Sequence, residues 1–212
     1  MSRENKEENE TFIDKYLQNY KLRFDSLHVF LSSQGVYTII TIADFFFNEL
    51  KKASEKEISF YLFGFTVATR SISDHILHDY HVKYFSNNVI KDRIEPMFIE
   101  RGKLNIKIFK CDARKYKHKE ALRFAKFWDE KINKFKKDRK MKFLKDMRDI
   151  TVHRKVVTRP HIIIIKNGEM GFGLEKRDSS GKIIFHEPDG IAFCKYCLNE
   201  MKKFVDEIKA EF

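Results

Sequence analysis

Apolar residues recur every three or four positions over most of the chain, the period that places them on one face of an α-helix. The first such stretch spans residues 10–31 and predicts a long amphipathic helix. Gly35 allows a break after it, because glycine disfavours a continuous helix. The same period then resumes over residues 36–52. We therefore expect two core helices that meet at a turn.

A third helix is predicted over residues 57–80, where the helical period continues. Its polar face carries three ionisable residues, Arg70, Asp74 and His78. Residues 85–117 show the weakest period and contain both a proline and a glycine, so we expect an irregular insertion there. Within it, apolar residues alternate over positions 104–108, which favours a short strand.

The second half of the chain begins with a long predicted helix over residues 119–150, which bends where the stretch 136–140 interrupts its apolar side. Beyond His153 the pattern changes to short apolar runs separated by turn signals. These signals lie at Asn167-Gly168 and at Asp178 to Gly181. They predict a small antiparallel meander, followed by a final amphipathic helix over residues 190–211.

Together these elements predict a mainly α fold: a helical bundle of long helices with a small antiparallel β meander and a C-terminal helix. We expect a flexible tail over residues 1–10, the bundle over 11–156, and the meander with the last helix over 157–212, packed on the same domain. Only eight Gly and three Pro punctuate the chain, which argues against a sandwich or barrel with many tight turns. The 21 Phe support a substantial core.

Membrane insertion and secretion are not expected from the sequence. The longest apolar stretch, residues 36–47, is well short of the roughly 20 residues that a membrane span needs. The acidic start of the chain lacks the features of a signal peptide. Three Cys, an odd number, fit a reducing compartment, so we expect a cytoplasmic protein without membrane partners. Cys194 and Cys197 are interpreted as two thiols on the last helix.

A formal net charge of +11 favours a polyanionic partner. Eleven Lys or Arg and only three Asp lie between positions 131 and 155, so this segment holds most of the excess charge. A solvated helix face is the alternative interpretation. If the segment binds RNA, we expect contacts chiefly with phosphates. The candidate residues for this role are Lys134, Lys136, Lys137, Arg139, Lys140, Lys142, Arg154 and Lys155.

The segment Arg148-Asp149-Ile150-Thr151-Val152-His153 closes the long basic helix. It resembles the Arg-[Asn/Asp/His]-x-x-x-His signature of the HEPN superfamily, whose members are compact helical bundles that often dimerise and in many cases act as metal-independent endoribonucleases. The resemblance extends loosely over residues 10–155 and leaves out the meander and the last helix. Arg70 with His75, and Arg154 with His161, match the bare Arg-x(4–6)-His spacing as well.

The resemblance implies that Arg148 and His153 are catalytic and that Asp149 supports them, with no cofactor and no metal. Near neutral pH a histidine can act as a base that accepts the proton of the RNA 2′-hydroxyl, or as an acid that donates a proton to the leaving group. An arginine can stabilise the negative charge on the phosphate. One histidine cannot be acid and base in the same turnover, so a homodimer that pairs two motifs would be useful. A five-residue step turns a helix by about 140°, so Arg148 and His153 would not converge on a straight helix. The β-branched residues Thr151 and Val152 favour a helix end between the arginine and the histidine.

Other sites and functions stay open at this stage. Ser71, Asp74 and His75 crowd within one helical turn and are interpreted as polar helix surface. Helical spacing also permits a metal site from His75, His78 and His81, with Asp74 and Asp79 nearby. Two functions compete with the endoribonuclease: a non-catalytic helical dimerisation or interaction module, and a nucleic-acid-binding accessory protein of a defence or mobile-element system.

Overall fold

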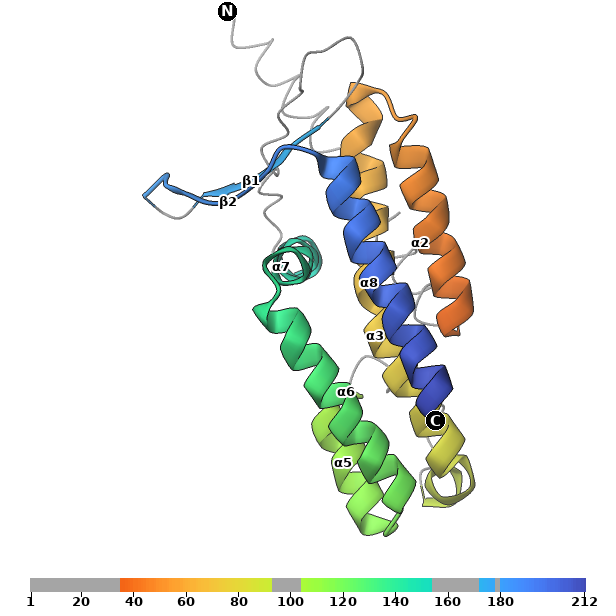
Figure 1. The fold of residues 1–212 in the computed structure, drawn as a ribbon. Helices are drawn as coiled ribbons and strands as arrows, with labels where there is room; N and C mark the ends of the chain where they lie inside the picture. Colours follow the sequence, from red (N-terminus) through yellow and green to blue (C-terminus); the bar gives the residue numbers. More distant parts are fainter. Residues whose placement is uncertain (1–34, 93–103, 154–171, 178–179) are drawn as a thin grey trace, which may run out of the picture. The chain divides into compact units, whose positions relative to one another are not determined.

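The computed structural model describes residues 35–92, 104–153, 172–177 and 180–212, which belong to one compact unit, Gly35–Phe212. Six helices and one antiparallel strand pair are described (Figure 1). This confirms the predicted mainly α bundle with a small β element and a C-terminal helix. The predicted helix over residues 10–31 and the turn at Asn167-Gly168 lie outside the described residues.

Helices α2 (Val36–Leu50) and α3 (Glu55–Asp92) form an antiparallel pair. The N-terminus of α2 is capped from its partner, because the Val36 amide donates to Asp79 Oδ2 at 3.1 Å. Helix α3 begins with a capping box, in which the Ser54 amide and hydroxyl both donate to the Glu57 carboxylate, at 2.9 and 2.6 Å. These hydrogen bonds lower the pKa of Glu57.

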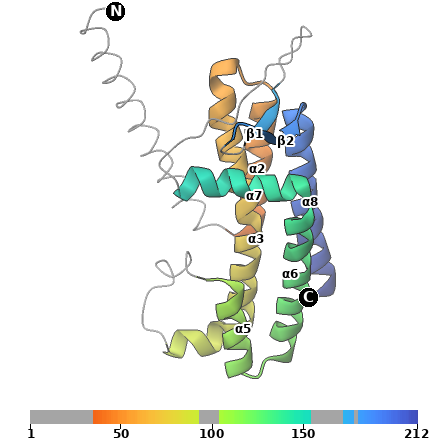
Figure 2. The same ribbon diagram turned by 90° about the vertical axis from the view of Figure 1, so that its left-hand side faces the viewer.

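Helix α8 (Gly190–Glu211) packs against both α2 and α3, and the three helices run side by side in both views (Figures 1 and 2). Asp189 caps α8 by accepting from the Ala192 amide at 2.8 Å. All of the predicted inward residues of α8 are buried: Phe193, Cys197, Met201, Phe204 and Ile208. The amphipathic period therefore identified both this helix and its inner face.

The predicted irregular insertion over residues 85–117 is wrong where the structure describes it. Helix α3 continues to Asp92, and helix α5 (Ile106–Lys115) occupies the region that was expected to hold a strand. The alternation over residues 104–108 coincides with the start of α5, and Asn105 caps it by accepting from the amides of Lys107 and Ile108, at 3.0 and 3.2 Å. Asn105 indicated the start of this helix better than the apolar alternation did, since asparagine is a favoured N-cap residue.

The long helix predicted from Lys119 is two helices, α6 (Lys119–Lys137) and α7 (Arg139–His153), separated at Asp138. The expected bend within 136–140 is thus confirmed. Helix α7 packs on α3, α6 and α8, and in Figure 2 it runs across α3 and α8. This arrangement packs α7 against α3 and α8.

Strands β1 (Leu174–Arg177) and β2 (Ile183–Glu187) form the antiparallel pair, with Leu174 opposite Glu187. Their connection includes Gly181, whose φ of 83° lies in the left-handed region that favours glycine. Phe185 of β2 stacks on Phe143 of α7 with ring centroids 3.9 Å apart, which joins the hairpin to α7. The second part of the predicted meander is therefore confirmed, and its first part, around the turn at Asn167-Gly168, lies outside the described residues.

Candidate functional site

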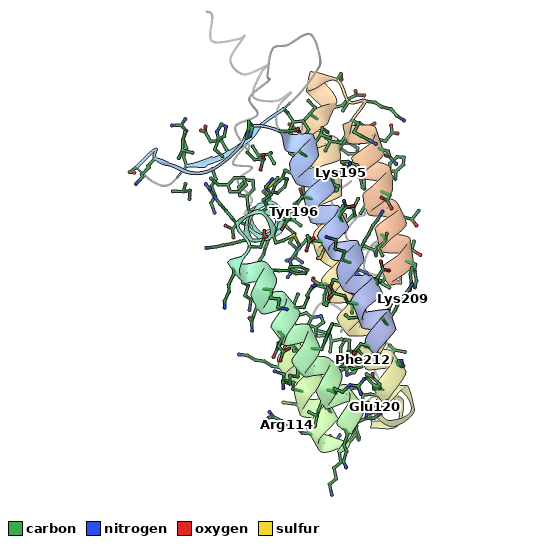
Figure 3. The ribbon with its side chains drawn as sticks, in the orientation of Figure 1. Arg114, Glu120, Lys195, Tyr196, Lys209 and Phe212 are labelled. Carbon is green, nitrogen blue, oxygen red and sulfur yellow. The ribbon has the colours of Figure 1, made fainter. Side chains whose placement is uncertain are left out.

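Asp138 fixes the junction between α6 and α7 through three hydrogen bonds. Its amide donates to Lys134 O at 3.0 Å and so ends α6. Its side chain begins α7, because Oδ1 accepts from the Met141 amide at 2.8 Å. Oδ2 accepts from the hydroxyl of Tyr196, which is labelled on α8 in Figure 3, at 2.6 Å. Through its backbone amide and its carboxylate, this one residue thus ties three helices together.

The hydrogen bond to Asp138 also affects the ionisation of Tyr196. A phenol that donates to a carboxylate resists losing its proton, and partial burial acts in the same direction. Both effects raise the pKa of Tyr196 above its ordinary value. The junction is therefore most stable while Tyr196 is protonated.

Lysines surround this junction on the solvent side. Lys134, Lys136 and Lys137 lie in the last turn of α6, and Lys142 lies in the first turn of α7; all four are exposed. Lys136 donates to Asn133 Oδ1 at 3.2 Å. Within the described part of the chain, the other three make no ion pair, and we call Lys134, Lys137 and Lys142 the junction lysines.

Two further predicted RNA-binding residues serve contacts within the protein. Lys140 forms an ion pair with Glu187 Oε2 at 2.7 Å. The guanidinium of Arg139 lies over the ring of Phe185, 5.3 Å from its centroid, and donates to Ile184 O at 3.4 Å. Both residues therefore join the β hairpin to α7. Arg154 and Lys155 lie outside the described residues.

Arg148 of α7 meets α3 at Asp74. Its guanidinium lies 3.9 Å from Asp74 Oδ2, and the guanidinium of Arg70 lies 3.4 Å from Asp74 Oδ1. The side chains of both arginines are 19% exposed to solvent, and the side chain of Asp74 is 49% exposed. Arg70 also donates to the hydroxyl of Ser73, a fully buried residue. The structure thus brings together two arginines that are far apart in the sequence.

His153 is the last residue of α7, which is continuous from Arg139. The helix end expected between Arg148 and His153 is therefore wrong; it lies after His153. Five residues along a continuous helix turn by about 140°, so the two positions lie on different sides of α7. The side chains of Asp149 and His153 lie outside the described residues, and their catalytic role stays a prediction.

The contribution of α3 to this site was not predicted from the sequence. Asp74 was interpreted as polar surface, and Arg70 as a chance match of the Arg-x(4–6)-His spacing. Periodicity did place both on one polar face, but no local signal shows that α7 lies against that face. The role of Asp138 was also missed, although an aspartate between two helical runs is a favoured N-cap.

The other sequence candidates lie elsewhere. His75 is buried, with Nδ1 2.8 Å from Ser71 O, and His81 Nε2 lies 2.8 Å from Asp112 Oδ2. Over the ranges that the structure describes, no three His, Cys, Asp or Glu side chains gather as metal ligands. Cys194 and Cys197 are buried on α8, and burial raises the pKa of both thiols. Such thiols are unreactive.

No helix among the described residues is long and apolar enough to cross a membrane. Comparisons of the chain with family models, with curated proteins and with solved structures give no match. A functional assignment therefore depends on the residues and geometry described above.

Proposed function

We propose that this protein is RNA-directed and binds single-stranded RNA through the phosphates, with the junction lysines as the main contacts. The observation that carries this proposal is the exposure of these three lysines without an ion pair among the described residues. Lysine ammonium groups that contact phosphates release bound counterions, and this release supplies most of the affinity for a polyanion.

Lys142 argues against a purely structural role for the lysines. Cations stabilise the C-terminus of a helix, where the backbone dipole is negative, so Lys134 and Lys137 suit the end of α6. Lys142 lies in the first turn of α7, where the dipole is positive and a cation is unfavourable. A lysine kept there without an acidic partner is better explained by an external anion.

Phosphates, rather than bases, are the expected contact. Of the large apolar side chains exposed within the described residues, the only aromatic ones are Tyr37 and Phe45, and both belong to α2. Neither lies on α6 or α7, and the half-buried Tyr196 at the junction has its hydroxyl bound to Asp138 and Lys140 over its ring, so base stacking is not expected to dominate there. Binding should therefore show little preference for sequence.

A charge-reversal experiment tests the proposal. In the variant K134E/K137E/K142E, affinity for a short single-stranded RNA, measured by fluorescence anisotropy at ~50 mM salt, should fall at least about tenfold, because three phosphate contacts become repulsive. The control K107E/K119E/K126E changes the net charge equally at exposed positions of α5 and the first half of α6, away from the junction. Equal loss in both variants would show that only net charge matters.

An enzymatic form of the same proposal is a metal-independent endoribonuclease that acts as a homodimer, with Arg148 and His153 as catalytic residues and Asp149 in support. The observation in its favour is that Arg148 is held beside a second arginine at Asp74, which concentrates positive charge where a phosphate can accept it. Because Arg148 and His153 lie on different sides of α7, we expect a second copy to complete the site.

Cleavage is tested by incubating RNA with the protein in EDTA. We expect products with a 2′,3′-cyclic phosphate and no cleavage of DNA, which lacks the 2′-hydroxyl. H153A and R148A should each reduce the rate by roughly a hundredfold or more, because proton transfer and charge stabilisation are each worth that much. H186A, at an exposed histidine of β2, is the control. Uncut RNA would favour the interaction module or the accessory protein.

The proposed setting is the cytoplasm. All three cysteines of the chain are free thiols, which fits a reducing compartment. An RNA-directed protein in this compartment meets its substrate directly.

A further inference from the structure

The cluster of Arg70, Ser73, Asp74 and Arg148 has the features of an anion site that is occupied by its own carboxylate. Arg70 contacts one oxygen of Asp74 and Arg148 contacts the other, so the two guanidinium groups converge on a single anionic group from two helices. Arg70 is also held by the buried Ser73, whose hydroxyl donates to Arg70 O at 3.2 Å. At least one of the two cations is therefore preorganised.

The distances show that Asp74 binds both arginines loosely. Charge-assisted hydrogen bonds between guanidinium and carboxylate are usually about 2.7–2.9 Å long. The contacts to Asp74 are 3.4 Å for Arg70 and 3.9 Å for Arg148. Asp74 also keeps 49% of its side-chain exposure, so solvent weakens both contacts further. An incoming anion would therefore displace only weak contacts with Asp74.

We infer that Arg70 and Arg148 together bind one phosphate group of the RNA, and that Asp74 is the resident counter-ion that this phosphate displaces. The inference rests on the proposed RNA-directed function, and it adds Arg70 of α3 to the site. Guanidinium groups form the same forked hydrogen bonds with phosphates as with carboxylates, so the arrangement that holds Asp74 also suits a phosphate. A phosphodiester has the same single charge as the carboxylate it replaces.

If a phosphate displaces Asp74, substitutions of the arginines and of the aspartate should have opposite effects on RNA affinity. R70Q and R148Q each remove a cation and should weaken RNA binding. D74N keeps the shape of the side chain but removes the competing charge, so it should strengthen RNA binding by about threefold to tenfold, given the usual worth of two partly exposed ion pairs. The matched control is D146N, which removes a carboxylate of α7 that pairs with Lys176 at 2.7 Å.

The test measures the affinity for a short single-stranded RNA at ~50 mM salt for the full-length protein and for the variants R70Q, R148Q, R70Q/R148Q, D74N and D146N. Because both arginines contact the same phosphate, the double variant should lose clearly less affinity than the product of the two single losses. D74N should bind more tightly than D146N. Multiplicative losses, an R70Q variant with unchanged affinity, or weaker binding by D74N would overturn the inference.

A second readout separates this inference from the proposed function. Inorganic phosphate should raise the thermal midpoint of the wild-type protein, compared with chloride at equal ionic strength, because a ligand that binds only the folded state stabilises it. The rise should be larger in D74N and smaller in R70Q. Phosphate-dependent stabilisation without RNA binding would refute the RNA-directed function and keep the anion site. RNA binding together with an equal phosphate-induced rise of the thermal midpoint in wild type and R70Q would refute the anion site but not the RNA-directed function. Tighter binding of poly-glutamate than of RNA would refute the assignment of the site to phosphate.

Discussion

Replacing Asp138 with alanine should destabilise the folded protein at the junction that positions the lysines. The substitution removes the side-chain cap of α7 and the acceptor for the Tyr196 hydroxyl in one step. It leaves the backbone hydrogen bond from residue 138 to Lys134 O possible, so α6 can still end there. The expected damage is therefore confined to the start of α7 and its contact with α8.

The size of the effect follows from the two lost hydrogen bonds. Loss of an aspartate N-cap costs typically about 1 kcal/mol. A hydrogen bond to a charged group is worth about 1.5–3 kcal/mol when buried, but Tyr196 and Asp138 are both only half-buried, so water replaces part of it and about 1 kcal/mol is a better value. D138A should thus lower the free energy of unfolding by about 2 kcal/mol.

Urea unfolding monitored by circular dichroism measures this change. D138N is the matched variant, because asparagine caps helices as well as aspartate does, and it should lose about 1 kcal/mol or less. In the double-mutant cycle of D138A with Y196F, the two losses should overlap by about 1 kcal/mol, because they remove the same hydrogen bond. A loss below ~0.5 kcal/mol for D138A, or equal losses for D138A and D138N, would refute this account of the junction.

The raised pKa of Tyr196 adds a pH dependence with a definite sign. A group whose pKa is higher in the folded state contributes its full stability below its unfolded pKa, which is about 10 for tyrosine. That contribution declines as the pH rises from there through the folded-state pKa. The difference in unfolding free energy between wild type and Y196F should therefore shrink above pH ~10. A constant difference would contradict a stabilising role for the hydrogen bond from Tyr196 to Asp138.

Two further predictions concern the core. G64A should destabilise the protein by about 1–3 kcal/mol, because a Cβ at Gly64 would overlap the ring of Phe46, and urea unfolding checks this. An unchanged midpoint would mean that this ring moves aside freely. In the native protein iodoacetamide should label Cys111, which is exposed, much faster than Cys194 and Cys197, whose burial raises their pKa. Mass spectrometry that finds the buried pair labelled at the same rate would contradict their burial.

Periodicity predicted the helices that bury one apolar face over many turns. Helix α8 is the clearest case, because its buried residues recur at helical spacing from Phe193 to Ile208. The hairpin of β1 and β2 was predicted from a turn signal that ends in Gly181, where the structure has a positive φ. In both cases the signal is local, so the sequence alone carries it.

The errors arose where short segments or contacts between distant segments decide the structure. Helix α5 has only ten residues, so its apolar positions were too few to separate helical spacing from alternation. The contact of Arg148 with Asp74 depends on the packing of α7 against α3. No pattern within either helix contains this information, so the sequence could suggest Arg148 as a functional residue but could not pair it with Arg70.

The salt dependence of RNA binding reports the number of phosphates that the protein contacts. We expect log K for a single-stranded RNA to fall linearly with log salt concentration. For K134Q/K137Q/K142Q the slope should be shallower by about 2, since each phosphate contact with a single strand contributes about 0.7. The control K107Q/K119Q/K126Q, at exposed positions of α5 and the first half of α6, should keep the wild-type slope. Equal slopes for wild type and K134Q/K137Q/K142Q would contradict the claim that the junction lysines bind the phosphates.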